Sequence, residues 1–289
     1  MELLAVRALL APVRLLPKAA ALRTARCYTA ALDRLVPRLR ATALRNLELA
    51  MAELGMPERR RLVDRVFVSL ARLLWTLARF PSIGKPNVGE WIRYEGFEHF
   101  EEARRRGKGV LFATGHLGNW ELSSFAHALM ARPMSIVVRP LDNPLLDEWL
   151  TQRRASSGNV VLGREQFVRP LLRALRNNEA VGILADQNVT AAEGVFVDFF
   201  GRKACVDPGF ARLAAKSGAA VIPGFAVWSE SEARYVLKFY PLLEMTGDAR
   251  ADTQAVQSAL ERAIREYPDQ WLWIHRRWKT RPEGEAPLY

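Results

Sequence analysis

The chain has 289 residues, a net charge of +11 and 49% hydrophobic residues. This length and hydrophobic content allow a sizeable buried core, in one large domain or two small ones. The two cysteines, Cys27 and Cys205, lie far apart outside any CxxC pattern, and the four histidines lack HExxH spacing. We therefore expect a reducing compartment, no disulfide framework and no bound metal.

The positive charge is concentrated at the N-terminus, where residues 1–45 hold nine basic side chains and two acidic ones. Such an excess suits anionic partners, including lipid headgroups, phosphorylated substrates, acidic proteins and nucleic acid. Residues 1–17 are rich in leucine but are interrupted by Arg7 and Arg14. The uncharged runs between these arginines are far shorter than the ~20 residues that a spanning helix needs.

Arg7 and Arg14 are seven residues apart and therefore share one face of a helix, with leucines around the rest. We expect residues 1–30 to form an amphipathic segment that lies in a membrane interface. The alternatives are a helix packed on its own domain, a marginal span with snorkelling arginines, and a transit peptide.

Residues 31–85 are predicted to be helical, because leucines recur there at helical spacing, and a loop over 81–89 is the best candidate boundary. From residue 91 onward, short β-branched runs alternate with helical patterns. This alternation predicts an α/β domain over residues 86–289, with a central, mostly parallel sheet flanked by helices, in one globular unit with 31–85. The expected strands cover residues 91–94, 110–113, 134–138, 160–162, 180–185, 219–227 and 234–240, and the expected helices 96–105, 118–130, 143–156, 166–176, 207–216 and 252–266.

The most informative stretch is VLFATGHLGNWE at 110–121, where an apolar run ends in a glycine-containing turn and His116 precedes Glu121 by five residues. A histidine oriented by a carboxylate can remove a proton from a hydroxyl near neutral pH. Residues five apart point about 140° away from each other on one helix. We therefore expect His116 in the turn after the strand and Glu121 in the first helical turn, with Asn119 as the N-cap. A capping or buried structural histidine is the alternative.

Polar residues also follow the next expected strands along the chain: Arg139, Arg164, and the pair Asp186 and Gln187. Ligands in open α/β sheets bind at the carboxyl ends of strands. We therefore expect these residues to share one polar site with His116, where an arginine would bind phosphate or polarise a carbonyl oxygen. Each of them taken alone is more often part of a solvated loop.

Two aromatic stretches have more than one interpretation. Residues 194–203 could line an acyl-chain tunnel, although a place in the core is favoured. Residues 271–281 interleave tryptophans with cations, which suits a membrane interface or stacked nucleic acid as well as an edge strand with a basic outer face.

With these residues identified, the chain resembles the late acyltransferases of lipid A biosynthesis, the lauroyl and myristoyl transferases. These belong to the lysophospholipid acyltransferase superfamily, whose signature is His-x4-Asp/Glu. The resemblance extends over residues 40–280, without the Phe-Pro-Glu-Gly block of the glycerophosphate branch. It depends on five blocks in family order: TGHLGNWE at 114–121, ADQN at 185–188, VDFFGRKA at 197–204, PGFARLA at 208–214 and QWLWIHRRW at 270–278.

The resemblance implies transfer of a fatty acyl group from acyl-carrier protein or acyl-CoA to a glycolipid hydroxyl, most directly that of a lipid A precursor. Attack on the thioester would be direct, without a covalent acyl-enzyme or a cofactor. His116 would be the base, and Glu121 would orient its ring. Arg164 would contact the acceptor phosphate or the thioester oxygen, and Asp186 would hold Arg164 or substrate. Further candidates for substrate binding are Arg139, Gln187 and Asn119.

The expected partners are an acidic acyl-carrier protein or a CoA thioester, a phosphorylated glycolipid and the membrane surface, with no nucleic acid. We expect the protein at the cytoplasmic face of the inner membrane, held peripherally or by a single N-terminal anchor. The alternatives are an acyltransferase for a lysophospholipid or for a glycolipid of the phosphatidylinositol mannoside type, and a non-enzymatic basic membrane-surface protein. A serine hydrolase is disfavoured, because the sequence lacks a Gly-x-Ser-x-Gly elbow.

Overall fold

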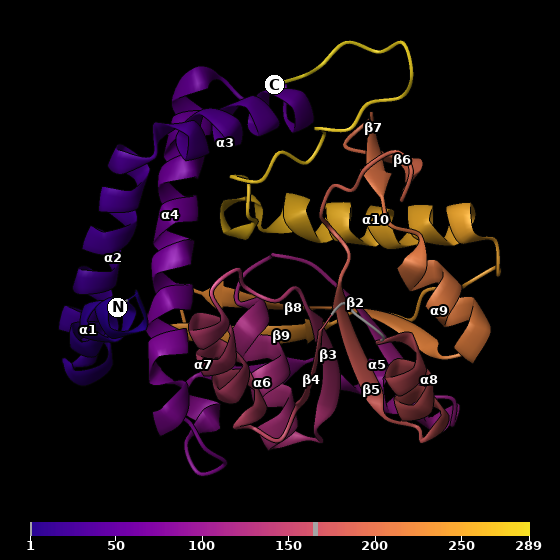
Figure 1. Cartoon of the computed structure of the whole chain (residues 1–289), viewed down its shortest axis with the longest axis horizontal. Coiled ribbons are helices and arrows are strands. Elements are labelled where there is room, and N and C mark those ends of the chain that lie inside the picture. Colours follow the sequence, from indigo (N-terminus) through magenta and orange to yellow (C-terminus); the bar gives the residue numbers. More distant parts are fainter. Residues whose placement is uncertain (1, 164–166) are drawn as a thin grey trace.

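The computed structural model describes residues 2–163 and 167–289 (Figure 1). Its N-terminal part consists of helices, two of which have a proline in the first turn. Pro37 and Pro57 lie in the first turns of the third and fourth helices. Backbone N–H groups of a first turn have no hydrogen-bond partner within the helix, so proline, which lacks this group, is tolerated there. The expected boundary at residue 30 falls within the second helix. The helices are α1 (Glu2–Leu15), α2 (Lys18–Leu35), α3 (Pro37–Ala50) and α4 (Met56–Arg79).

A central sheet follows, with the strand order β1-β9-β8-β2-β5-β3-β4 among the described residues. Strands β8, β2, β5, β3 and β4 run parallel, whereas β9 pairs antiparallel with β8 and parallel with β1. The prediction of a mostly parallel sheet flanked by helices is confirmed. The strands of this sheet are β1 (Ile92–Glu95), β2 (Val110–Thr114), β3 (Met134–Val138), β4 (Val160–Gly163), β5 (Ala180–Leu184), β8 (Ala220–Ser229) and β9 (Arg234–Phe239).

Helices cover both faces of this sheet, which explains why its central strands are almost uninterrupted apolar runs. Successive residues of β2 alternate between the two faces. Val110 and Phe112 pack with α5 and α6, whereas Leu111 and Ala113 pack with the side of the sheet covered by α8, α9 and α10. The flanking helices are α5 (Phe97–Arg105), α6 (Trp120–Met130), α7 (Pro144–Ala155), α8 (Val168–Arg176), α9 (Gly209–Ser217) and α10 (Ala249–Glu266), and short 3-10 turns are η1 (Phe80–Ser82), η2 (Val88–Glu90) and η3 (Pro268–Gln270).

A two-stranded hairpin, β6 (Val195–Phe199) and β7 (Arg202–Val206), lies beside α10 and was not expected from the sequence. Its turn is Phe200-Gly201, with φ of 53° and 68°. A two-residue turn with both φ values positive is usually announced by Asn-Gly or Asp-Gly, so the sequence carried no strong hairpin signal. Phe199 and Phe200 are buried, which agrees with the core interpretation of 194–203 rather than with a tunnel.

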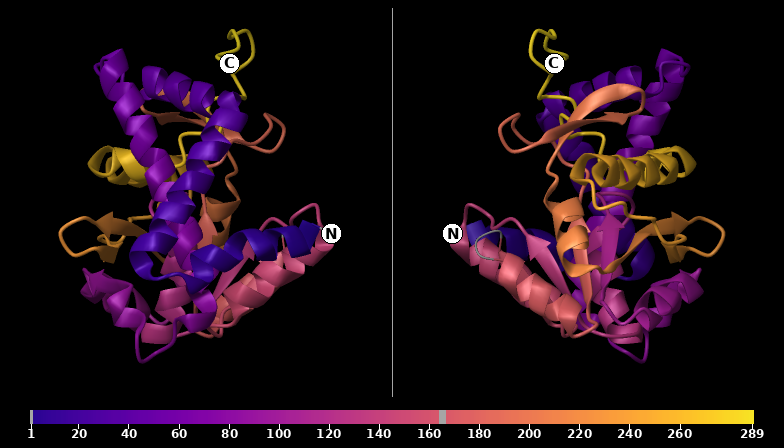
Figure 2. Two further views of the ribbon diagram at one scale, coloured as in Figure 1. Left: turned by 90° about the vertical axis from the view of Figure 1, so that its left-hand side faces the viewer. Right: turned by 90° about the vertical axis from the view of Figure 1, so that its right-hand side faces the viewer.

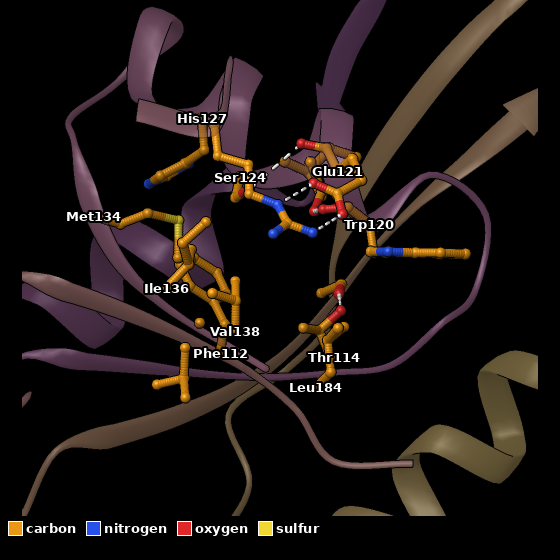
Figure 3. A pocket seen from close by; sticks show the side chains of 16 residues that line it. Phe112, Thr114, Trp120, Glu121, Ser124, His127, Met134, Ile136, Val138 and Leu184 are labelled. Atoms are coloured by element: carbon orange, nitrogen blue, oxygen red, sulfur yellow. Dashed lines mark hydrogen bonds and ion pairs between the residues drawn. The ribbon is translucent and has the colours of Figure 1, made fainter. Parts of the chain in front are cut away.

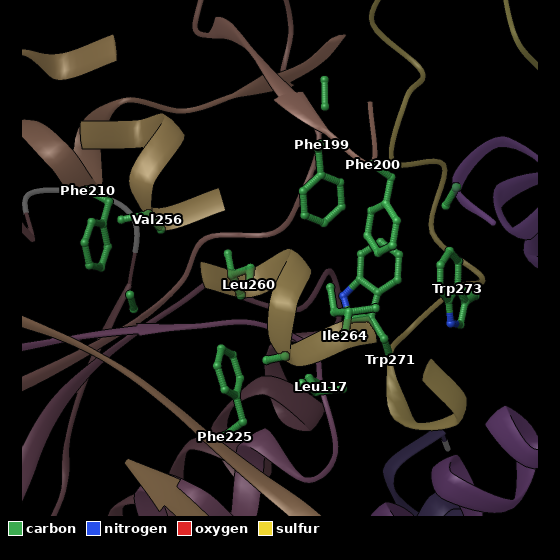
Figure 4. Close-up of a cluster of buried hydrophobic side chains, with 14 of the residues drawn as sticks. Leu117, Phe199, Phe200, Phe210, Phe225, Val256, Leu260, Ile264, Trp271 and Trp273 are labelled. Carbon is green, nitrogen blue, oxygen red and sulfur yellow. The ribbon is translucent and has the colours of Figure 1, made fainter. Parts of the chain in front are cut away.

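The C-terminal tryptophans belong to the same core (Figure 4). Trp271, Trp273 and Trp278 are buried against the hairpin phenylalanines. Arg277 is buried as well, and its guanidinium donates to the backbone carbonyl of Cys205 and to the side chain of Gln257. The expectations of an edge strand, a membrane interface or nucleic-acid stacking are therefore wrong for these side chains. The tryptophans and Arg277 instead pack in the core, between the hairpin and α10.

Helix α1 lies beside α7 at the periphery of the molecule (Figure 2). Its Leu10 and Val13 are buried against the domain, whereas Leu4, Leu9 and Leu15 are exposed. One side of the helix is thus packed on its own domain, as one of the alternatives for this segment expected. Among the described residues, no helix combines the length and the apolar character needed to cross a bilayer.

Candidate active site

The site forms at the carboxyl ends of the parallel strands. His116 lies in the turn between β2 and α6, and Asp186 follows β5. The turn requires glycine at position 118, because φ is 66° and an added Cβ would lie 2.0 Å from the carbonyl oxygen of Ala226. Because β5 pairs directly with β2, Asp186 is brought next to His116.

The His116 ring is held by Asp186. Its Nδ1 is 2.8 Å from Asp186 Oδ1, and the backbone N–H of His116 donates to Asp186 Oδ2 at 2.7 Å. The indole N–H of Trp271 donates to the same Oδ2 at 2.8 Å. With Nδ1–H donating to the carboxylate, the neutral ring keeps Nε2 as its acceptor. The amide nitrogen of Gln187 lies 3.4 Å from this Nε2.

Asp186 and His116 shift each other's pKa. Burial of Asp186 would raise the pKa of its carboxyl, but the charge and hydrogen bonds of His116 and the Trp271 N–H outweigh burial and lower that pKa well below its usual range. Burial likewise tends to lower the pKa of His116, yet the Asp186 carboxylate raises that pKa above 6.5, with a smaller contribution from Glu121. The Asp186 carboxylate therefore stays ionised, and it stabilises the protonated form of the His116 ring relative to the neutral form.

The expectation that Glu121 orients the His116 ring is not met, because Asp186 occupies that place. Glu121 does lie in the first turn of α6, as predicted from the spacing. Its carboxylate forms a two-pronged ion pair with Arg154 of α7, with Nε–Oε2 and Nη2–Oε1 distances of 2.8 and 2.5 Å. Asp186 reaches His116 because β5 lies between β2 and β3 in the sheet. The spacing of residues along the chain does not reveal this strand order.

Arg154 is the residue that sequence reasoning missed. It lies near the end of α7 without a motif around it, and only the Asn143-Pro144 start of its helix was recognisable. The side chains of Arg154 and Glu121 are 14% and 10% exposed, so the ion pair is almost fully buried. A buried pair is tolerated only while both partners are present, and burial of this kind is common at functional sites.

The other predicted residues divide into two groups. Arg139 and Gln187 are exposed and line the same cavity as His116, as expected for residues at neighbouring strand ends. Asn119 is fully buried: its Oδ1 accepts from the Leu122 N–H and its Nδ2 donates to Thr76 Oγ1. This position contradicts a substrate contact and leaves Asn119 as the N-cap of α6. Arg164 lies outside the described residues.

Two contiguous cavities meet at the Glu121–Arg154 pair. The larger, of about 870 Å³, contains His116 and is lined by cations that include Arg139, Arg212 and Lys216. The smaller, of about 70 Å³, lies behind the ion pair between α6 and the sheet (Figure 3). Their shared walls are Trp120, Glu121, Val137, Val138, Arg154 and Leu184. Within residues 2–163 and 167–289, no group of three or more His, Cys, Asp or Glu side chains is placed to hold a metal ion.

A histidine that is paired with a buried carboxylate and lines a partly apolar cavity has the chemistry of a general base for a hydroxyl. Together with the α/β sheet and the His-x4-Glu spacing, it defines an acyltransferase of the class that the sequence resembles. The family of bacterial lipid A biosynthesis acyltransferases matches residues 3–280, and the chain belongs to this family.

Several characterised relatives carry related names. The chain is 30% identical over 256 residues to a lipid A biosynthesis palmitoleoyltransferase of Escherichia coli (strain K12), covering 87% of the chain and 82% of the relative. It is 30% identical over 248 residues to a lauroyltransferase of the same organism, covering 85% and 80%. A phosphatidylinositol mannoside acyltransferase of Mycolicibacterium smegmatis is 29% identical over 222 residues, covering 75% and 72%. The predicted family and enzyme class are confirmed.

Proposed function

We propose that the protein transfers a fatty acyl group from the thioester of acyl-carrier protein or CoA to a hydroxyl of a lipid A precursor. The observation that carries this proposal is the His116–Asp186 pair, because it leaves Nε2 as a base beside a cavity of about 870 Å³. The thioester is the co-substrate, and the reaction needs no further cofactor.

In the proposed reaction, His116 Nε2 takes the proton of the acceptor hydroxyl while its oxygen attacks the thioester carbonyl carbon. A new C–O bond forms, the C–S bond breaks, and the departing thiolate takes the proton from the imidazolium. Asp186 stabilises the positive ring between these steps, since its carboxylate remains ionised beside it. No residue of the chain is acylated in this scheme.

Arg154 is proposed to stabilise the carbonyl oxygen as negative charge develops on it. Its guanidinium lines both cavities, and Glu121 fixes its position through two hydrogen bonds. A fixed cation in a site that excludes water stabilises a developing oxyanion more strongly than a solvated one does. In this scheme Glu121 acts on Arg154 and only indirectly on His116.

The charge of the larger cavity supports a phosphorylated acceptor. Arg139, Arg212 and Lys216 line it, and cations of this kind bind phosphate or an acidic carrier protein. The relative named as a phosphatidylinositol mannoside acyltransferase supports a second candidate acceptor, a phosphorylated glycolipid of another class.

We also propose that the protein works at the cytoplasmic face of the inner membrane, where thioester donors meet lipid acceptors. Helix α1 supports this location, because it presents Leu4, Leu9 and Leu15 together with Arg7 and Arg14 to the outside. Helix α1 contacts α7, and the residue Leu141 just before α7 lines the larger cavity, so the membrane-facing helix and the site lie on neighbouring elements.

The test is an acyl-transfer assay with purified protein. It offers acyl-carrier-protein and CoA thioesters in turn to a lipid A precursor, a phosphatidylinositol mannoside and a lysophospholipid, with mass spectrometry of the products. We expect acylation of the lipid A precursor, and the His116→Ala variant should fold normally but lose about 10²–10⁴ in kcat. Full activity in His116→Ala would refute the mechanism, and exclusive acylation of another lipid would replace the acceptor.

A further inference from the structure

The smaller cavity is an apolar pocket that the transfer step itself does not use. It lies between α6 and the sheet and continues from the larger cavity past the Glu121–Arg154 pair. Apart from Thr114 and two serines of α6, its walls beyond that junction are mainly apolar: Phe112, Met134, Ile136, Gly182, Gly224 and Leu237, with His127 from α6. A pocket of this chemistry next to a site for a fatty thioester is suited to hydrocarbon.

We propose that this pocket receives the end of the acyl chain and that Met134, lying over Gly182, sets the length of chain that is accepted. The inference rests on the proposed acyl transfer and adds to it a specificity-determining element.

The size of the pocket limits it to the end of a chain. From Glu121 to His127 helix α6 rises about 9 Å, at 1.5 Å per residue. The cavity volume is about 70 Å³, whereas an apolar cavity of about 150 Å³ holds one benzene molecule. Only a few terminal carbons therefore fit, and a difference of one or two methylenes matters.

Met134 and Gly182 lie on the side of the pocket away from its junction with the larger cavity. Figure 3 shows Met134 and His127 on the side opposite to Trp120. Met134 is 5% exposed, and a Cβ added to Gly182 would lie 2.8 Å from its Cε. A glycine in the interior of a strand weakens the strand and often marks a place where another group approaches the backbone closely. At Gly182 the group that approaches is the side chain of Met134.

His127 gives the same side of the pocket an uncharged wall. The residue is 2% exposed, its Nδ1 lies 3.1 Å from the hydroxyl of Tyr94, and burial lowers the pKa of His127 to about 4. At neutral pH the ring therefore carries no charge, and a hydrocarbon end can pack against it. Since His127 and Tyr94 are themselves packed among aromatic rings, the flexible Met134 side chain is the wall that can most easily be changed.

The experiment measures kcat/KM for a series of saturated acyl thioesters of even chain length. We expect the wild type to have an optimum, Gly182→Ala to shift it to shorter chains, and Met134→Ala to shift it to longer ones. One methylene in an apolar pocket discriminates by about 10–200-fold, so each variant should change the ratio between adjacent even chains by at least about tenfold. The double variant Gly182→Ala/Met134→Ala should return toward the wild-type optimum, because the lost thioether makes room for the added methyl.

Matched controls are available in the chain. Met130→Ala changes a methionine at the end of α6 that is 36% exposed and lines a different hollow, and Gly89→Ala adds a methyl with no atom within 4 Å. Neither should alter the chain-length profile. An unchanged profile in active Met134→Ala overturns the inference even if Gly182→Ala fails to fold. If the wild type transfers no acyl group from any thioester, the proposed function fails first and this inference falls with it.

Discussion

The carboxylate of Asp186 is the residue-scale feature on which His116 depends, because it fixes the ring by one hydrogen bond and the backbone by another. Asp186→Asn keeps the size of the side chain but removes its charge. We expect kcat to fall by about 10²–10⁴, since an amide neither enforces the correct tautomer nor stabilises the imidazolium. Steady-state acyl transfer measures this loss, and Asp198→Asn, which changes an exposed carboxylate, is the control.

The same variant makes a prediction about pH dependence. A base must be unprotonated to accept a proton, so kcat/KM should rise with pH through the pKa of His116. Asp186 raises that pKa above 6.5, so the midpoint in the wild type should lie above 6.5. Removing the charge in Asp186→Asn should move the midpoint to lower pH. A midpoint that moves upward or stays in place would show that Asp186 does not act on the His116 base.

The Glu121–Arg154 pair allows stability to be separated from catalysis. Removing one partner, as in Glu121→Gln or Arg154→Met, leaves a nearly buried charge without its counterion and should lower the free energy of unfolding by about 3 kcal/mol. The double variant should recover much of this stability. It should not recover activity, because the proposed oxyanion contact is still missing. Urea unfolding and kcat measured on the same four proteins decide this, and recovery of both would assign the pair a structural role alone.

At this scale the sequence predicted the positions of His116 and Glu121 but not which carboxylate contacts the histidine. The positions of His116 and Glu121 follow from local rules, namely a glycine turn and the 3.6-residue period of the helix. The contact from Asp186 depends on strand order, which brings β5 between β2 and β3. Arg154 depends on how α7 packs against α6. Both are tertiary relations without a local signature.

At the scale of elements, the start of α6 links the active-site turn to the N-terminal helices. Asn119 caps α6 and also donates to Thr76 of α4, while its backbone N–H donates to Ala226 of β8. Asn119→Ala should lower the free energy of unfolding by about 2 kcal/mol, the sum of a lost cap and a lost hydrogen bond to the Thr76 hydroxyl, which keeps its own donation to the Leu73 carbonyl. Asn143→Ala, at the half-buried cap of α7, should cost about 1 kcal/mol. Equal losses in urea unfolding would show that the bond to Thr76 adds nothing.

The elements that could be predicted share a physical property, namely a strong local pattern. The apolar runs of β2, β5 and β8 and the capped start of α7 are recognisable without tertiary knowledge. The hairpin β6–β7 lacked a usual turn sequence, and the antiparallel direction of β9 is not encoded in its alternation. The C-terminal tryptophans looked interfacial because cations separate them, yet buried Arg277 shows that one of those cations belongs to the core.

At the scale of the whole molecule, charge and apolar surface coincide on α1. Arg7 and Arg14 are exposed beside leucines that the domain does not cover. Each arginine near an anionic bilayer contributes about 1 kcal/mol. The double variant Arg7→Gln/Arg14→Gln should therefore weaken binding to vesicles containing phosphatidylglycerol by about 30-fold at low salt, as measured by co-sedimentation. High salt should reduce the difference, because the contribution is electrostatic.

A change in total charge alone must be distinguished from a local contact. Arg104→Gln/Arg105→Gln removes the same charge from α5, a helix that packs on β8, β9 and β2. If the α1 surface meets the membrane, this control should bind vesicles nearly as well as the wild type. Equal weakening by the two double variants would attribute binding to net charge.

Replacing the exposed Leu15 by serine tests whether α1 inserts its apolar side chains into the membrane interface. A leucine buried there contributes about 1.5–3 kcal/mol to binding. Its loss should therefore weaken vesicle binding even in high salt, where the arginines no longer contribute.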